Sequence, residues 1–339
     1  MKWLPVILAL SVFALMSSCS DNSSGSGTSR AKVKLAFVSN GVDPFWTIAG
    51  AGARKGAEEA GAEAVVRFPN EGIPDQQRIV EDLVSLGVQG VAISPIDPVN
   101  QLAFLNEIAG KTHLITQDSD AKDSKRLCYV GMDNYAAGLL CGALAREALP
   151  DGGKVMIFIG RIEQENARRR RQGTIDGFLG RKPDPTRFDE PGQVQTEGKY
   201  TVLDTRTDAF DKARAKANAE DALVRHPELD AMVGLFAYNV PACLEALRGA
   251  KKLGVVKMIG FDEAEECLAG IAEGTVVGTV VQNPYEYGRE SMRILAGLAR
   301  GDRSVLPANG VLEVPARVIR KADVAAFSAT VKAQLAAGR

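Results

Sequence analysis

The stretch KLAFVSNGVDPFW, residues 34–46, decides how this chain is interpreted. Its first five residues are an apolar run typical of a β-strand. Asp43 followed by Pro44 predicts a helix N-cap with proline at the first helical position, ahead of the small-residue stretch AGAGARKGAEEAG. The stretch therefore predicts a strand followed by a helix, with the large aromatic pair Phe45 and Trp46 at the connection.

The same alternation continues along the chain. Segments of helical length, such as 74–87 and 209–227, carry apolar residues at three- and four-residue spacing. Short apolar, β-branched runs predict strands at 32–38, 62–68, 90–94, 113–116, 154–160, 231–236, 256–260 and 274–281. Nearly uniformly apolar strands separated by helices indicate parallel sheets covered on both faces. Because the alternation is too long for one sheet of normal size, we expect an α/β fold with two doubly wound parallel-sheet lobes.

Bulk composition excludes some classes of partner. The chain has 339 residues, of which 45% are hydrophobic and 24% charged, and its formal net charge is −1. This is ordinary globular composition with ample material for a core. The near-zero net charge gives no electrostatic reason to expect nucleic acid or an anionic membrane surface as a partner.

The first nineteen residues predict export. Lys2 is followed by an apolar run too short to span a bilayer comfortably, which is typical of a secretory signal peptide. The ending Met16-Ser17-Ser18-Cys19 resembles the lipobox of bacterial lipoproteins, which implies lipidation of Cys19, with residues 20–31 as a flexible tether. Cleavage nearby without lipidation, giving a freely soluble exported protein, is the alternative. In both cases we expect the folded part in the periplasm or cell envelope.

The other cysteines show no metal-ligand or redox spacing. Each lies in an apolar or helical context, which predicts small buried thiols, and one disulfide stays open in an exported protein. They are Cys128, Cys141, Cys243 and Cys267.

Polar residues gather directly after the predicted strands. In doubly wound sheets, ligands bind beyond the carboxyl ends of the strands. Five of seven such ends carry an Asp, Asn or Gln able to make two hydrogen bonds at once. The seven ends are 39–46, 94–97, 117–120, 160–161, 238–239, 261–262 and 282–284.

At these strand ends the sequence resembles the periplasmic sugar-binding proteins of the ribose-binding type, which belong to the type I periplasmic binding proteins and serve ABC importers. The motifs are VSNGVDPFW, ITQDSDA, GMDNYAAG, ENARRRRQG, YNVPACLEAL, IGFDE and GTVVQNPYEYG. The resemblance spans residues 32–319 and implies two lobes joined by a three-segment hinge. It places 32–132 and 283–311 in an N-terminal lobe, 133–282 and 312–319 in a C-terminal lobe, and 320–339 in a C-terminal tail.

The resemblance also implies a set of ligand-binding residues. Two positions depart from the ribose-binding pattern: Asp43 replaces the usual Asn, and Ser119 replaces an Arg beside Asp118. Ribose itself is therefore in doubt, whereas a small polyhydroxylated ligand is not. The implied set is Ser39, Asp43, Phe45, Trp46, Asp118, Ser119, Arg168, Phe210, Asn239, Asp262 and Gln282.

The residue types suit a sugar for independent reasons. Aromatic planes pack on C–H-rich sugar faces, while Asp, Asn, Gln and Arg bond vicinal hydroxyl pairs. Phe45 and Trp46 are therefore interpreted as one wall of a sugar slot. The alternative is a hydrophobic staple or lid on the first helix.

Other functions are disfavoured by spacing. Four consecutive arginines, 168–171, point to different sides of a helix, which argues against a polyanion site. Asp204, Asp208 and Asp211 lack the spacing of a calcium loop, so no metal is predicted and Asp208 is interpreted as an N-cap. No nucleophile motif or dinucleotide fingerprint is present, so we predict no catalytic residues, no enzyme activity and no cofactor.

We therefore expect a monomeric, exported receptor for a monosaccharide or related polyol that delivers it to an ABC permease by lobe closure. A sensory receptor coupled to a chemoreceptor or kinase, for a sugar or an autoinducer, is the alternative. A repressor of the LacI type is disfavoured because a signal segment occupies the place of its DNA-binding helices. A lipid anchor is the only membrane contact expected.

Overall fold

The computed structural model describes residues 32–338; the predicted signal segment, Cys19 and the tether lie outside them. Two sheets form the framework, as expected from the sequence, and all strand pairs are parallel except two at sheet edges. Within the described residues, no helix is long and apolar enough to cross a membrane.

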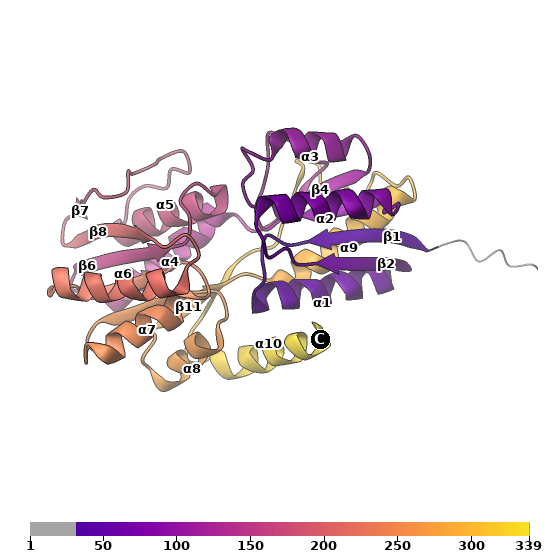
Figure 1. Ribbon diagram of the computed structural model, residues 1–339. Helices are drawn as coiled ribbons and strands as arrows, with labels where there is room; N and C mark the ends of the chain where they lie inside the picture. The colour runs from indigo at the N-terminus through magenta and orange to yellow at the C-terminus, as the bar shows by residue number, and fades with distance from the viewer. Residues whose placement is uncertain (1–31, 339) are drawn as a thin grey trace, which may run out of the picture. The chain divides into compact units, whose positions relative to one another are not determined.

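The first sheet has the strand order β12-β5-β4-β3-β1-β2. Leu35 and Phe37 face one side of it, against α1 and α9, while Ala36 and Val38 face the other, against α2 and α3 (Figure 1). The strands are β1 (Val33–Val38), β2 (Ala62–Arg67), β3 (Gly90–Ile93), β4 (His113–Gln117), β5 (Tyr129–Gly131) and β12 (Val311–Glu313). The helices are α1 (Pro44–Glu59), α2 (Ile73–Ser85), α3 (Leu102–Ala109) and α9 (Pro284–Ala299). Together these elements are called the first lobe.

The second sheet has the order β13-β11-β10-β9-β6-β8-β7. Val155 and Ile157 pack toward α4 and α5, and Met156 and Phe158 pack toward α6, α7 and α8. The strands are β6 (Gly153–Ile159), β7 (Gln195–Glu197), β8 (Tyr200–Thr207), β9 (Ala231–Gly234), β10 (Lys257–Phe261), β11 (Gly278–Val281) and β13 (Arg317–Ile319). The helices are α4 (Asn134–Ala148), α5 (Glu165–Leu179), α6 (Lys212–Arg225), α7 (Asn239–Gly249), α8 (Glu265–Glu273) and α10 (Val324–Gly338). These elements are called the second lobe.

The chain passes between the two sheets three times: after β5, after β11 and after β12. Because β12 pairs with β5, residues 312 and 313 lie in the first sheet, two residues beyond the expected boundary at 311. The expected tail contains the helix α10, which contacts α1 of the first lobe and α8 of the second (Figure 1). Phe327 and Val331 of α10 are buried in one cluster with Ile48 of α1.

All four described cysteines are buried free thiols, which confirms the prediction made from their apolar contexts. Burial raises the pKa of each, to about 11 for Cys128 and about 12 for Cys141 and Cys267. The thiolate form is therefore disfavoured at neutral pH, and these residues serve as core side chains.

Glycines let α1 and α9 approach closely. A Cβ at Gly52 would overlap the carbonyl oxygen of Tyr285, and one at Gly288 would overlap that of Ala49. Backbone meets backbone at this crossing, so no side-chain movement can make room for a methyl group. The crossing holds the start of α1, and hence Asp43 and the aromatic pair, against the hinge end of α9.

We expect Gly52→Ala to lower the free energy of unfolding by about 1–3 kcal/mol through overpacking. Gly249→Ala is the control, because nothing lies within 4 Å of its added Cβ and it ends a helix. That variant should be neutral or slightly stabilised, since Ala loses less backbone freedom than Gly. Denaturant unfolding of both variants measures the difference, and equal stabilities would contradict the close crossing.

Candidate functional site

In the first lobe, the strand ends hold Asp118 in a polar network. Its carboxylate accepts from Ser94 Oγ at 3.1 Å, and Asn40 Nδ2 donates to the same hydroxyl at 3.1 Å. Tyr129 Oη donates to the backbone carbonyl of Asp118 at 2.9 Å. These residues follow or lie on β4, β3, β1 and β5, which are neighbours in the sheet. Strand order therefore determines which side chains meet at this edge.

In the second lobe, Asp262 holds the equivalent place after β10. Gln282, which follows the neighbouring strand β11, donates from Nε2 to Asp262 Oδ1 at 2.8 Å. Tyr287 of α9 donates to Gln282 Oε1 at 3.2 Å, and its ring lies 6.4 Å from that of Phe45. This chain of contacts joins Asp262 to the aromatic pair of the first lobe through the hinge.

Asp208 is buried and accepts hydrogen bonds from three neighbouring residues, but it does not cap a helix, so its interpretation as an N-cap was wrong. The N-cap of α6 is Asp211, whose side chain accepts from the backbone of Arg214. Asp208 accepts instead from Asn239 Nδ2 at 2.9 Å, from Tyr238 Oη and from the backbone nitrogen of Phe210 at 2.9 Å. These hydrogen bonds hold in place Phe210, Tyr238 and Asn239, which together are called the wall of the second lobe.

Phe210 is the exposed aromatic of this wall. Its side chain is 39% exposed, and its ring lies 5.6 Å from Phe236 and 6.2 Å from Tyr238. Gly160 makes this placement possible, because a Cβ there would press against the ring. By contrast, Phe45 and Trp46 are only 8% and 5% exposed and belong to the core of the first lobe.

Among the four consecutive arginines, Arg170 lies nearest the candidate site, whereas Arg168 was expected there. Arg168 is exposed, while Arg170 is 1% exposed. Arg170 donates from Nη1 to the carbonyl of Leu235 at 2.7 Å and from Nη2 to Asn134 Oδ1 at 3.0 Å. Its guanidinium lies 4.0 Å from the ring centre of Phe261. The buried face of α5 passes through 167, 170, 174 and 178, so helical periodicity counted from Ala167 and Phe178 could have found Arg170.

The other two arginines have structural partners. Arg169 pairs with Asp133 at 3.1 Å and with Glu165 at 3.5 Å. Arg171 is buried and donates to Thr205 Oγ1 and to the carbonyl of Asp189. The run of arginines is therefore divided among different faces of the helix, as the 100° rotation per residue predicts.

Backbone strain is concentrated at the same place. Among the described residues, five that are not glycine have positive φ, and four of them belong to this site: Asp118 (59°), Ala209 (57°), Phe210 (67°) and Asp262 (65°). Asp tolerates the left-handed region, whereas Phe and Ala do so at a cost of about 1–3 kcal/mol. Strained backbone of this kind occurs where side chains must be held for function. No sequence pattern indicated it.

The carboxyl groups of the site act on one another across the lobes. Burial raises the pKa of Asp118 to about 7 and that of Asp262 to about 6. In both cases Arg170 acts in the opposite direction and lowers the pKa, whereas a neighbouring carboxylate raises it further. For Asp262 that neighbour is Asp43 of the first lobe. Burial also raises the pKa of Asp43, and Lys212 of the second lobe partly offsets this.

The remaining expected residues lie at the same edges, but several are turned inward. Ser39 donates its hydroxyl to the carbonyl of Gly41 at 2.6 Å, within its own loop. Asp43 caps α1 by accepting from the backbone nitrogen of Phe45 at 3.0 Å, as predicted. Asn239 donates one amide hydrogen to Asp208 and accepts at Oδ1 from the backbone nitrogen of Phe236. Ser119 is buried with no hydrogen-bond partner for its hydroxyl.

The lobes also touch directly, since Gln164 at the start of α5 donates to the carbonyl of Ile96 at 3.0 Å. Among the described residues, no group of three or more His, Cys, Asp or Glu side chains could hold a metal ion.

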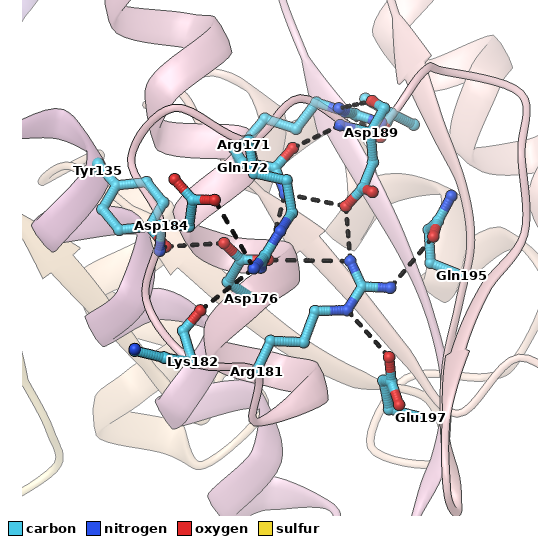
Figure 2. Close-up of polar contacts among 12 residues, drawn as sticks. Tyr135, Arg171, Gln172, Asp176, Arg181, Lys182, Asp184, Asp189, Gln195 and Glu197 are labelled. Carbon is cyan, nitrogen blue, oxygen red and sulfur yellow. Dashed lines mark hydrogen bonds and ion pairs between the residues drawn. The ribbon is translucent and has the colours of Figure 1, made fainter.

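A cavity of about 540 Å³ lies on the second lobe beside α5, away from the residues described above. Figure 2 shows that Arg181 is paired with Asp189 and Glu197 there, while Lys182 makes its contact through its backbone carbonyl. Asp176 is fully buried and accepts from Tyr135 Oη and Arg187 Nη1, while Arg181 pairs with Asp189 at 2.7 Å. These contacts fasten the loop after α5 to the helix that carries Arg170, and we interpret the cavity as structural.

A family model described as a periplasmic binding protein domain matches residues 35–303, and the chain belongs to this family. Among curated proteins, the ribose import binding protein of Bacillus subtilis (strain 168) is 26% identical over 296 residues, covering 85% of this chain and 90% of that protein. The D-allose-binding periplasmic protein of Escherichia coli (strain K12) is 22% identical over 284 residues, covering 80% and 85%.

Solved structures show the same fold. A solute-binding protein of an ABC transporter from Burkholderia graminis C4D1M, in complex with D-arabinose, matches with a TM-score of 0.77 at 24% identity, covering 86% of this chain and 96% of that one. A periplasmic solute-binding protein from Actinobacillus succinogenes 130z with bound D-allose matches with a TM-score of 0.76 at 18% identity, covering 87% and 100%.

The raised carboxyl pKa values predict a pH dependence of stability. A group whose folded pKa lies above its unfolded value of about 4 stabilises the fold fully at low pH, and loses that contribution as pH rises through the folded pKa. Asp118 therefore contributes less at pH 8 than at pH 5. Asp118→Asn mimics the protonated acid and tolerates the left-handed backbone. We expect the unfolding free energy of wild type relative to this variant to fall by at least about 1.4 kcal/mol between pH 5 and pH 8.

Denaturant titrations of ligand-free protein at both pH values measure this difference. A gap between wild type and variant that stays constant with pH would show that Asp118 titrates near its ordinary value.

A second prediction compares two neighbours on α5. Arg170→Ala removes a buried cation and leaves the carbonyl of Leu235 and the side chain of Asn134 without their donor. We expect a loss of about 3–5 kcal/mol in the free energy of unfolding. The exposed Arg168→Ala is the control and should stay within about 0.5 kcal/mol of wild type. Similar losses in both variants would contradict the assignment of Arg170 as the buried cation of the site.

Proposed function

We propose that this protein is an extracytoplasmic receptor that binds a small polyhydroxylated ligand, a monosaccharide or related polyol, between its two lobes. One observation carries the proposal: strand ends of both lobes direct the strained, buried residues Asp118 and Asp262 toward Arg170 and one another. Carboxylates bond pairs of vicinal hydroxyl groups, which a polyol supplies. The sugar-binding names of the relatives agree with this chemistry.

Each wall has a distinct part in binding. Phe210 packs its exposed ring on the apolar face of the ligand. Phe45 and Trp46 form the opposite side of the site, where little of their surface is exposed. Asp118 and Asp43 bind from the first lobe, and Asp262, Gln282 and Asn239 from the second lobe and hinge. Ser39 and Ser119 complete the first-lobe edge. Arg168, exposed on α5, is replaced by Arg170 in this proposal.

Ligand bridging the lobes drives closure, because only differential affinity for the closed form can shift that equilibrium. We propose that the closed protein delivers its ligand as a monomer to the permease of an ABC importer. Export through the signal segment and anchoring at Cys19 hold it at the cell envelope. No chemical step is assigned to the site: it binds and releases its ligand unchanged, without a cofactor.

A thermal-shift screen of purified protein against pentoses, hexoses and polyols tests the proposal. A ligand at a hundred times its dissociation constant should add about 2.7 kcal/mol of stability. Incubation of each hit with the protein should leave the hit chemically unchanged by chromatography. The proposal is wrong if no compound stabilises the protein, or if the protein turns a hit over.

Two phenylalanines of equal exposure give a matched test of the exposed wall. Phe210 and Phe188 are each 39% exposed, but Phe188 lies over Arg171, away from the site. Phe210→Ala should weaken ligand binding by about 1–3 kcal/mol through lost burial and stacking. Phe188→Ala should leave the affinity unchanged in isothermal titration calorimetry. Equal affinities of the two variants would remove Phe210 from the site.

A further inference from the structure

Glu263 is a buried acid without a partner. It directly follows Asp262, it is only 8% exposed, and neither carboxyl oxygen has a hydrogen-bond partner in the described part of the chain. Burial raises the pKa of its carboxyl group well above the ordinary range, and the carboxylates of Asp262 and Asp43 raise it further. An unpaired buried carboxyl costs several kcal/mol relative to a solvated one, so its presence calls for an explanation.

Glu263 is one of the residues that line a cavity next to the sugar site, and its carboxyl oxygens are themselves buried behind that lining. This cavity has a volume of about 200 Å³. Gln282 belongs to both places, because it lines the cavity and also donates to Asp262. Ile48, Thr330 and Gln334 are among the other lining residues, contributed by α1 and α10. Arg317 also lines it, but this exposed guanidinium stacks over Phe327, 4.9 Å from the ring centre.

The donors of Gln282, Asn239 and Arg170 are partly occupied within the protein, and each group keeps further N–H hydrogens. Gln282 Nε2 is bonded to Asp262, and Asn239 Nδ2 to Asp208. Arg170 directs three of its five N–H groups to Asn134 and Leu235. Neither Glu263 oxygen has a partner, and the raised pKa favours the protonated carboxyl in the ligand-free protein. A cation beside it would favour the ionised form, which offers acceptors only, so a ligand group that meets ionised Glu263 must be a donor.

The charged groups at the site are also unbalanced, because acidic side chains outnumber the buried cations. Asp43, Asp118, Asp262 and Glu263 act on one another electrostatically, and within residues 32–338 Arg170 is the buried cation that acts on Asp118 and Asp262. Lys212 acts on Asp43 from an exposed position, where solvent screens its charge. Hydroxyl groups can supply donors to these acids, whereas an ammonium group supplies three donors and the missing positive charge together.

We infer that the ligand carries a protonated amine on its polyhydroxylated skeleton, and that Glu263 and Asp262 receive this ammonium group. The inference rests on the proposed function, because it specifies the ligand of the same site. An aminated monosaccharide, amino sugar alcohol or aminated cyclitol has this chemistry. The hydroxyl groups meet Asp118 and the aromatic wall, and the amine points past Gln282 into the cavity at Glu263.

Matched ligands test the inference. Calorimetry on purified full-length protein would compare glucose with glucosamine, galactose with galactosamine, mannose with mannosamine, and sorbitol with 1-amino-1-deoxysorbitol. N-acetylglucosamine adds a bulky but uncharged nitrogen substituent. We expect at least one amine to bind at least tenfold tighter than its neutral counterpart.

Isosteric variants assign the charge to Glu263. Glu263→Gln should weaken binding of the amine at least tenfold, change binding of the neutral counterpart less than twofold, and keep the melting temperature of the ligand-free protein. Glu266→Gln is the control, because this acid of α8 is exposed, and it should change nothing. Asp43→Asn removes a second negative charge while keeping a good N-cap residue; because Asp43 also binds the neutral ligand in the proposed function, it should weaken both classes and weaken the amine more.

The outcomes separate the two hypotheses. Neutral sugars that bind as tightly as the amines would overturn the inference and leave the proposed function standing. Binding of neither class would overturn the proposed function, and the inference with it. A Glu263→Gln variant that binds both classes equally less tightly, with a lower melting temperature, would show that Glu263 is structural and overturn its assignment.

Discussion

The site depends on one buried cation held among acids from both lobes. Arg170 is fixed by Leu235 and Asn134, so its position is set by the second lobe alone, while its charge acts on Asp118 of the first lobe and Asp262 of the second. Without a positive charge at this place, burial would keep both carboxyls protonated at neutral pH. The strained backbone at Asp118 and Asp262, the polar network around Ser94 and the amide of Gln282 all serve to hold acids near this guanidinium. Because the acids come from different lobes, the electrostatics of the site depend on how far the lobes are closed.

The sheets and the edge that carries the site could be predicted because they follow from local patterns. The run at residues 34–46 predicts a strand and a helix capped by Asp43, and the structure has both. The strands that escaped prediction are short or polar. β7 is the edge strand of its sheet and β8 lies next to it, and both carry polar and partly exposed residues, so apolar alternation is weak there. β5 and β12 have three residues each, too few for a periodic signal.

Individual side chains were harder to place than strands. Four adjacent arginines are alike in sequence, and only packing of α5 decides that Arg170 is buried and Arg168 exposed. The roles of Asp208 and Glu263 depend on contacts between distant segments, such as Tyr238 with Asp208, which no local pattern encodes. The two departures from the ribose-binding pattern, Asp43 and Ser119, both make the site more negative. That both departures change the charge of the site in the same direction becomes apparent only once the structure brings the acids together.

The C-terminal helix α10 contacts both lobes at once. It follows β13 of the second lobe, packs with α8, and buries Phe327 and Val331 in a cluster that includes Ile48 of the first-lobe helix α1 (Figure 1). A hinge motion that separates α1 from α8 must therefore break one of these apolar contacts and expose its surface to water. The equilibrium between the open and closed forms of the ligand-free protein then includes a hydrophobic free-energy contribution from contacts that do not involve the ligand. Substitutions on α10 can in this way change ligand affinity from outside the binding site, with the chemistry of recognition unaltered.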